Sequence, residues 1–137
     1  DMNGDKKTDI VLADKDKIVW YENPTWKKHQ ISGHLTQRDH VCVTARDLNG
    51  DGMAEIAVGA QWNIGETSND KTSGSIFYLN PTANREGNWK PIRLPHEPTT
   101  HRMQWIKSGK GKFDRIVKPL HGRGNSGGKG KGINVYA

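Results

Sequence analysis

The sequence has little cysteine, no long hydrophobic run and no extended helical pattern of apolar residues. Cys42 is the single cysteine among 137 residues, which excludes disulfides within the chain and zinc sites of the usual cysteine type. No apolar run approaches the roughly 20 residues that a membrane-spanning helix needs. No apolar stripe of helical period extends beyond about two turns. We therefore expect a chain built from strands, without a membrane span.

Positive charge is concentrated at one end of the chain. Eight of the 21 Lys and Arg residues, but one of the 15 acidic residues, lie in residues 107–137, so this segment carries +7 and the remainder −1. Much of this segment is the Gly/Lys sequence GRGNSGGKGKG. Its aromatic residues are Phe113 and, at its end, Tyr136. Proteins that bind nucleic acid interleave aromatic residues with cations for base stacking. We therefore predict no nucleic-acid partner.

The chain repeats one order of segments. An acidic nonapeptide is followed by a short apolar run, a run that ends in Asn-Pro-Thr and a run that begins with Trp. The first copy, from Asp1, reads DMNGDKKTD, IVLA, IVWYENPT and WKKHQI; the second, from Asp47, reads DLNGDGMAE, IAVGA, SIFYLNPT and WKPIRL. An eroded third copy places KSGKGKFDR, Lys107 to Arg115, on the acidic nonapeptide. Such periodicity is typical of a repeat architecture.

Each unit is a set of β-branched and aromatic runs separated by Gly, Pro and Asn turns. Four antiparallel strands in about 40–50 residues is the size of a propeller blade. We predict an all-β fold, a partial β-propeller of about two and a half four-stranded antiparallel blades. Residues 1–36 form a blade that lacks its first strand, residues 37–97 a complete blade, and residues 98–137 a blade that lacks its last strand. The unpaired edges predict that the remaining blades come from the same or another chain.

The acidic nonapeptides present oxygen ligands at alternate positions, which is the ligand type that Ca²⁺ prefers. Side-chain oxygens stand at positions 1, 3, 5 and 9, and position 7 offers its carbonyl. The predicted ligands are Asp1, Asn3, Asp5, Lys7 and Asp9 in the first loop, and Asp47, Asn49, Asp51, Met53 and Glu55 in the second. Cations replace acids in the third copy, so no metal is expected there.

Two other structures compete with this calcium loop. An EF-hand needs a bidentate Glu at position 12, but Leu12 and Val58 occupy that position, and the flanking sequences are typical of strands. The EF-hand is therefore excluded. The second alternative is an Asx-rich turn without metal, which repetition at matching places disfavours.

The pattern D-x-N-G-D-x-x-x-[DE]-hydrophobic resembles the FG-GAP/VCBS-type repeats of β-propeller proteins. The segments VWYENP…W..H.I and RDLNGDGMAEIAVGAQW carry this resemblance over most of the chain. It implies Ca²⁺ bound through the acidic loops and commonly a seven-bladed wheel.

Histidine and arginine gather in HEPTTHRMQW and KPLHGRGN, around the third unit. The candidate catalytic residues are His101, Arg102, His121 and Arg123, because a neutral His can accept a proton and an Arg can hold an oxyanion. This stretch resembles, more loosely, propeller-fold sugar lyases such as aldos-2-ulose dehydratase. These side chains can equally hold loops at a blade rim, so whether the chain is an enzyme stays open.

The favoured function is a calcium-binding repeat module that binds carbohydrate or a protein partner in a secreted, extracellular or periplasmic protein. Such a module predicts exposed aromatic side chains, with Trp62 as a candidate. The first alternative is a fragment of a sugar lyase or dehydratase, a carbon–oxygen lyase with His101 and His121 converging on one cavity. A purely structural surface repeat is the second alternative, and it predicts neither feature.

Overall fold

The chain folds entirely into strands and loops in the computed structural model, which describes residues 1–109, 112–119 and 134–136. These residues contain no helix, so the predicted all-β class is confirmed, and no helix among them is long and apolar enough to span a membrane. The strands are β1 (Ile10–Ala13), β2 (Ile18–Glu22), β3 (Lys27–Ser32), β4 (Cys42–Arg46), β5 (Glu55–Ala60), β6 (Ser75–Asn80), β7 (Lys90–Leu94), β8 (Thr100–Gly109), β9 (Lys112–Pro119) and β10 (Asn134–Tyr136).

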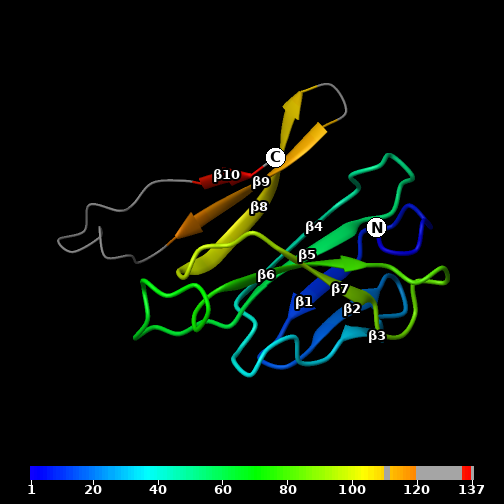
Figure 1. Ribbon diagram of the computed structural model, residues 1–137. Helices are drawn as coiled ribbons and strands as arrows, with labels where there is room; N and C mark the ends of the chain where they lie inside the picture. Colours follow the sequence, from blue (N-terminus) through cyan, green and yellow to red (C-terminus); the bar gives the residue numbers. More distant parts are fainter. Residues whose placement is uncertain (110–111, 120–133, 137) are drawn as a thin grey trace.

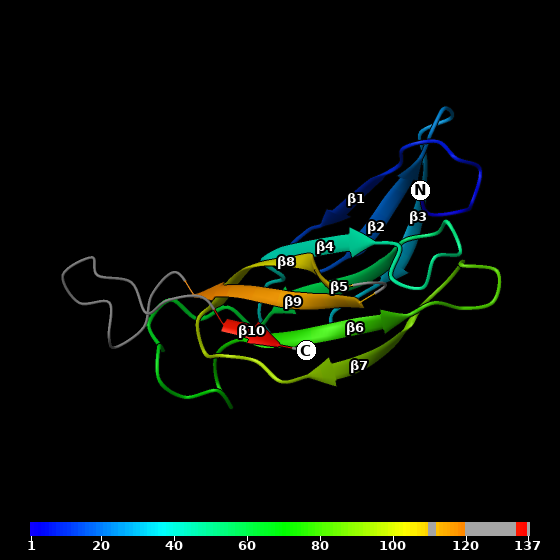
Figure 2. The same cartoon turned by 90° about the horizontal axis from the view of Figure 1, so that it is seen from above.

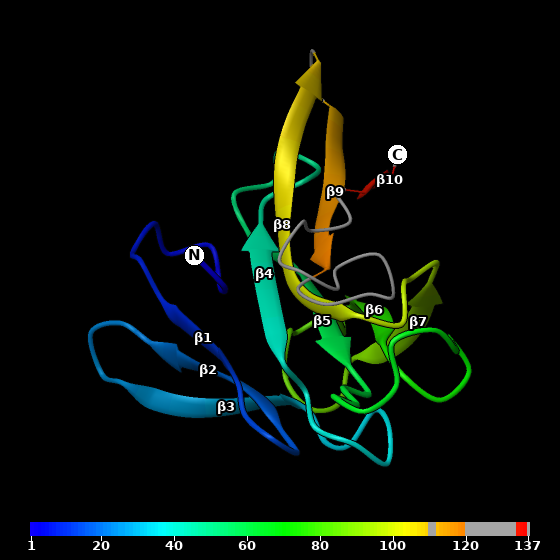
Figure 3. The same ribbon diagram turned by 90° about the vertical axis from the view of Figure 1, so that its left-hand side faces the viewer.

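The strands form three antiparallel sheets in which neighbours in the chain are neighbours in the sheet. The first sheet has the order β1-β2-β3, the second β4-β5-β6-β7 and the third β10-β9-β8. The three sheets lie side by side, with β4 in contact with β1 on one side and with β8 on the other (Figures 1 and 3). Successive blades of a propeller are arranged in this way, although the number of blades in the complete wheel stays a prediction.

The hydrophobic core lies between the first and second sheets. All six residues of β5 are buried, because neighbouring sheets cover both of its faces. Side chains from both sheets and their loops fill the space. The core members are Met2, Ile18, Trp20, Ile31, Ala54, Ile56, Val58, Ala60, Phe77, Leu79 and Trp89. This shared core holds the two sheets together through burial of apolar surface.

Backbone hydrogen bonds also join the first sheet to the second. His40 N donates to Lys15 O at 3.0 Å, and Trp89 N donates to Ile31 O at 2.8 Å. The two bonds involve different loops of the second sheet, one before β4 and one before β7. The sheets are therefore fixed at separate points along their length.

The connecting segments divide between two ends of the sheets. Residues 1–9, 47–54 and 81–89 project from one end, which we call the acidic-loop end (Figure 2). Residues 61–74 and 95–99 lie at the other end. The first acidic nonapeptide thus directly precedes β1, and the second ends in the first residue of β5, so each leads into a strand as the sequence predicted.

The third nonapeptide does not form a loop like the other two. β8 continues through Gly109 and β9 begins at Lys112, with Lys107 paired to Phe113 and Gly109 paired to Lys112. The described part of this segment is therefore paired strand. Lys and Gly have replaced the Asp and Asn side chains that accept local backbone hydrogen bonds, so the backbone pairs across the hairpin instead.

Candidate functional site

The first acidic loop is organised around the carboxylate of Asp1. Its Oδ1 accepts a hydrogen bond from Gly4 N at 2.7 Å, and its Oδ2 accepts one from Lys6 N at 2.6 Å. At the other end of the loop, Asp9 Oδ2 accepts a hydrogen bond from Met2 N at 2.7 Å. The first and last carboxylates therefore hold the loop closed.

The second loop repeats this pattern at the same relative positions. Asp47 Oδ1 accepts a hydrogen bond from Gly50 N at 2.6 Å, and Asp47 Oδ2 accepts one from Gly52 N at 2.9 Å. Glu55 Oε2 accepts a hydrogen bond from Leu48 N at 2.8 Å. The longer Glu side chain thus plays the part that Asp9 plays in the first loop.

The middle positions also match between the loops. The side-chain oxygen at positions 3 and 5 accepts a hydrogen bond from the backbone N–H two residues later. These bonds run from Asp5 to Asn3 (3.1 Å) and Lys7 to Asp5 (2.9 Å), and from Asp51 to Asn49 and Met53 to Asp51 (both 2.8 Å). Short-range bonds of this kind are typical of Asx turns.

Two positions in each loop adopt left-handed backbone conformations. Position 4 is Gly4 (φ 83°) or Gly50 (φ 87°), where a residue without a Cβ carries no steric cost. Position 6 is Gly52 (φ 86°) in the second loop but Lys6 (φ 65°) in the first. A left-handed conformation costs a non-glycine residue about 1–2 kcal/mol. The first loop adopts the shared shape despite this cost.

The carboxylates of the second loop differ in their electrostatic surroundings. Burial raises the pKa of Glu55, which is 4% exposed, and the nearby Asp51 and Asp47 carboxylates act in the same direction against the Leu48 N–H and Arg85. The Gly50 and Gly52 N–H groups lower the pKa of Asp47. The loop therefore holds one acid that burial disfavours as an anion and another that hydrogen bonds favour as an anion.

An amide nitrogen lies between two carboxylates of this loop. Asn49 Nδ2 donates to Asp51 Oδ2 at 3.1 Å and is 3.4 Å from Glu55 Oε1. A positive donor end thus stands where these carboxylates approach each other, and their oxygens are of the hard type that Ca²⁺ prefers. The side-chain oxygens of this loop are therefore chemically suited to bind Ca²⁺.

The carboxylates do not form a metal centre by themselves. Within residues 1–109, 112–119 and 134–136, no group of three or more His, Cys, Asp or Glu side chains is placed to hold a metal ion. A cation would therefore also need the amide oxygens of Asn3 or Asn49 and the backbone carbonyls of Lys7 or Met53. These are the neutral oxygen ligands that the sequence predicted at positions 3 and 7.

The two acidic loops touch one another. Ala54 N, at the end of the second loop, donates to Asp1 O at 2.8 Å. The side chain of Met53 packs at the position that a Cβ on Gly4 would face, at 3.5 Å from Cγ, and Met2 is 1% exposed in the core. The first loop therefore rests on the second.

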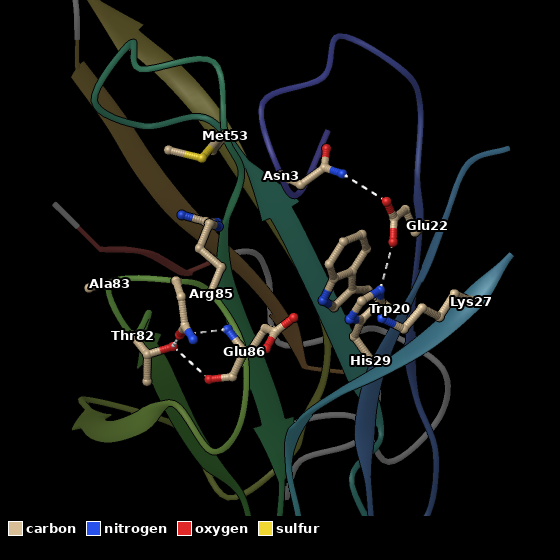
Figure 4. A pocket seen from close by; sticks show the side chains of 11 residues that line it. Asn3, Trp20, Glu22, Lys27, His29, Met53, Thr82, Ala83, Arg85 and Glu86 are labelled. Carbon is tan, nitrogen blue, oxygen red and sulfur yellow. Dashed lines mark hydrogen bonds and ion pairs between the residues drawn. The ribbon is translucent and has the colours of Figure 1, made fainter. Parts of the chain in front are cut away.

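A cavity of about 460 Å³ opens beside both loops, between the first and second sheets (Figure 4). The first sheet lines one wall, where the Trp20 and His29 rings stack at 4.2 Å and 12°. Glu22 closes this wall, because its Oε2 lies 2.8 Å from His29 Nε2 and its Oε1 lies 3.4 Å from Asn3 Nδ2.

The opposite wall of the cavity comes from residues 82–86, in the loop between β6 and β7. Arg85 is 8% exposed, donates through Nη2 to Ala54 O, and places its guanidinium 4.8 Å from the centre of the Trp89 ring. The sequence analysis missed this cavity. The Trp20–His29 pairing across β2 and β3 follows from the strand rhythm, but no pattern in the sequence marks Arg85.

Two of the candidate catalytic residues, His101 and Arg102, lie at the start of β8, at the end of the sheets opposite the acidic loops. His101 on β8 meets the Trp62 ring edge-on, with centroids 4.8 Å apart and planes at 71°, whereas Arg102 is exposed. His121 and Arg123 lie outside the described residues. The convergence predicted for His101 and His121 is therefore not tested.

A neighbouring histidine has the better defined partners. Arg93 Nη2 donates to His96 Nε2 and to Ser75 Oγ, each at 3.2 Å. Burial lowers the pKa of His96, and the Arg93 charge lowers it further. This pair holds a neutral imidazole beside a guanidinium at the end of the second sheet.

Comparison with protein families identifies the repeat. A family model described as an FG-GAP-like repeat matches residues 1–58, and one described as an FG-GAP repeat matches residues 43–79. The matched segments contain both acidic loops. No curated protein and no solved structure matched the chain.

Proposed function

The chain contains FG-GAP repeats, the units of a propeller repeat module, and we propose that it is a calcium-stabilised binding module of a secreted protein. The two matching acidic loops carry the calcium proposal. Asp1, Asn3, Asp5, Asp9 and the Lys7 carbonyl would hold one ion.

The second loop would hold another ion through Asp47, Asn49, Asp51, Glu55 and the Met53 carbonyl. A bound cation supplies positive charge that offsets repulsion among the carboxylates. Two features of the loops support this assignment: their backbones share one hydrogen-bond pattern, and Asp51 and Asp47 both raise the pKa of Glu55. Millimolar extracellular calcium would keep even weak loops filled.

Thermal melts with excess EDTA and with millimolar Ca²⁺ test this proposal. At about 100 times the dissociation constant, a ligand stabilises the folded state by about 2.7 kcal/mol, so calcium should raise Tm by several degrees. Asp47→Ala should shrink this rise, because it removes the side chain that organises the second loop.

Lys107→Ala is the control, since Lys107 is exposed and lies in β8 rather than in an acidic loop. It should leave the effect of calcium unchanged. Identical melts of the unmodified chain in Ca²⁺ and EDTA would exclude the calcium proposal.

The sugar lyase or dehydratase remains the second candidate. The Arg93–His96 pair supports it, because burial and the adjacent guanidinium favour a neutral imidazole that can accept a proton. Release of an unsaturated sugar product, followed by absorbance and lost in His101→Ala and His96→Ala, would establish this activity. Binding of a sugar without turnover would favour the binding module.

A further inference from the structure

The cavity beside the acidic loops presents opposite charges that do not pair with each other. Arg85 and Glu86 both line it, and Glu86 extends toward the Trp20–His29 wall (Figure 4). Within the described part of the chain, neither residue makes an ion pair within 4 Å. The space between them therefore separates a cation from an anion.

Arg85 has unused hydrogen-bonding capacity. It is 8% exposed, and its Nε has no hydrogen-bond partner among the described residues. Among the described residues, the guanidinium makes one hydrogen bond, to the Ala54 carbonyl, and the Trp89 ring covers it. A buried charge without an ion-pair partner is destabilising, and stacking on an aromatic ring offsets part of that cost. An acceptor in the cavity would offset the rest.

Glu86 can accept hydrogen bonds from a ligand, whereas Arg85 can donate them. The backbone groups of Glu86 bond to Thr82 and Asn84, but its carboxylate has no hydrogen-bond partner among the described residues. Glu22, the other acid of the cavity, is already engaged by His29 and Asn3. The cavity thus has one acid ready to accept and one guanidinium ready to donate.

A hydroxyl group is both a donor and an acceptor, so a ligand with neighbouring hydroxyls satisfies both sides at once. The charged lining residues, Glu22, Lys27, Arg85 and Glu86, sum to zero, which favours a neutral ligand over an ion. The volume of about 460 Å³ lies within the range of small-molecule sites.

An exposed aromatic residue stands next to the cavity. Trp26 is 51% exposed in the turn between β2 and β3, one residue before Lys27 of the cavity lining. The backbone N–H of Trp26 donates to Glu22 O at 2.6 Å, and the φ of Trp26 is 56°. The turn therefore holds a large flat side chain in solvent, of the amphipathic kind that serves binding surfaces.

We propose that this cavity is a carbohydrate site that takes one neutral hexose unit between Arg85 and Glu86, with Trp26 stacking on the next unit of the chain. The proposal names the ligand class of the binding module proposed above and rests on that function, but it does not require calcium. It predicts weak binding of single sugars, with dissociation constants near the millimolar range.

The Trp20 indole N–H signal in ¹⁵N-edited NMR spectra is the readout, since Trp20 lines the cavity. Trp20→Phe assigns this signal. D-glucose, D-galactose and D-mannose are each titrated to about 50 mM, and D-glucuronate and L-glutamine serve as anionic and zwitterionic comparators. At least one hexose should shift the signal in a saturable way, and more strongly than either comparator.

Matched variants locate the contact. Glu86→Gln should weaken hexose binding about tenfold, the effect of losing one hydrogen bond to a charged group. Asp70→Asn makes the same chemical change at an exposed acid in the distant segment 61–74 and should leave affinity unchanged. Trp26→Ala should weaken binding of a disaccharide of the same hexose but not of the hexose itself.

Three results would overturn the carbohydrate site: no hexose shifts the Trp20 signal, L-glutamine shifts it while hexoses do not, or Asp70→Asn weakens binding as much as Glu86→Gln. Every titration is run in Ca²⁺ and in EDTA. Hexose binding in EDTA by a chain whose melts ignore calcium would support the cavity and reject the calcium loops. A calcium-dependent Tm without any hexose shift would do the reverse.

Discussion

Gly74 and Gly87 provide a matched test of how tightly the second sheet is joined to the chain that follows it. Both have left-handed backbones, with φ of 71° and 72°. A Cβ on Gly87 would meet nothing within 4 Å, whereas a Cβ on Gly74 would lie 2.1 Å from the backbone oxygen of Glu97. Alanine at the two positions therefore differs in its close approach to the Glu97–Pro98 backbone.

The expected loss of unfolding free energy follows from three terms. Left-handed alanine costs about 1–2 kcal/mol at either position, and the reduced entropy of the unfolded chain offsets about 0.4–1 kcal/mol, which leaves about 1 kcal/mol for Gly87→Ala. The contact at Gly74 adds about 1–3 kcal/mol, the range for overpacked sites. The Glu97 oxygen cannot easily move away, because Thr100 N and Thr100 Oγ1 donate to it at 3.2 and 2.8 Å.

Urea unfolding of both variants measures this difference, and thermal melts should separate them by roughly 4–12 °C for a chain of this size. The two variants should have the same m-value, which would indicate that both unfold to equally exposed states and differ in stability alone. The packing argument fails if Gly74→Ala lies within about 0.5 kcal/mol of Gly87→Ala, the usual uncertainty of additivity.

Two further predictions concern titratable groups, the buried His40 and the half-buried Cys42. Burial lowers the pKa of His40, whose Nδ1 lies 2.9 Å from Asp14 O. The contribution of neutral His40 to the free energy of unfolding is therefore complete above pH about 6.5 and is lost as the pH falls below that value. His40→Asn, which keeps a donor near Asp14, should flatten the difference in unfolding free energy between pH 7 and pH 5, and an unchanged slope would refute this role. Burial raises the pKa of the Cys42 thiol to about 11, so the folded chain should react with iodoacetamide at pH 8 far more slowly than the urea-unfolded chain; equal rates would contradict the burial.

Local features of the fold were predictable from sequence. The hydrogen bonds that shape each acidic loop join side chains to backbone N–H groups at most seven residues away, so the spacing of Asp, Asn and Gly contains most of the information needed. Asp9 Oδ1 also accepts a hydrogen bond from the more distant Asn23 N. The runs IVLA and SIFYLN likewise predicted β1 and β6, because alternating β-branched and aromatic residues suit a half-covered sheet.

Features that join distant segments were not predictable. The cavity combines residues of the first acidic loop, β2, β3 and the loop after β6. The sequence around Arg85 does not indicate that its side chain donates a hydrogen bond to the Ala54 carbonyl. The close approach of Gly74 to Glu97 depends on the path of two loops. The third nonapeptide aligns with the other two copies in sequence, but its described residues belong to the paired strands β8 and β9.

The hydrogen bond from Ala54 N to Asp1 O has a consequence for measurements on the acidic loops. Because this bond joins the end of one loop to the start of the other, beside the contact between Met53 and Gly4, a change in the position of either loop is transmitted to its neighbour. Free-energy changes from substitutions in the two loops are therefore non-additive, and a thermodynamic cycle between Asp9 and Asp51 would measure their crosstalk directly.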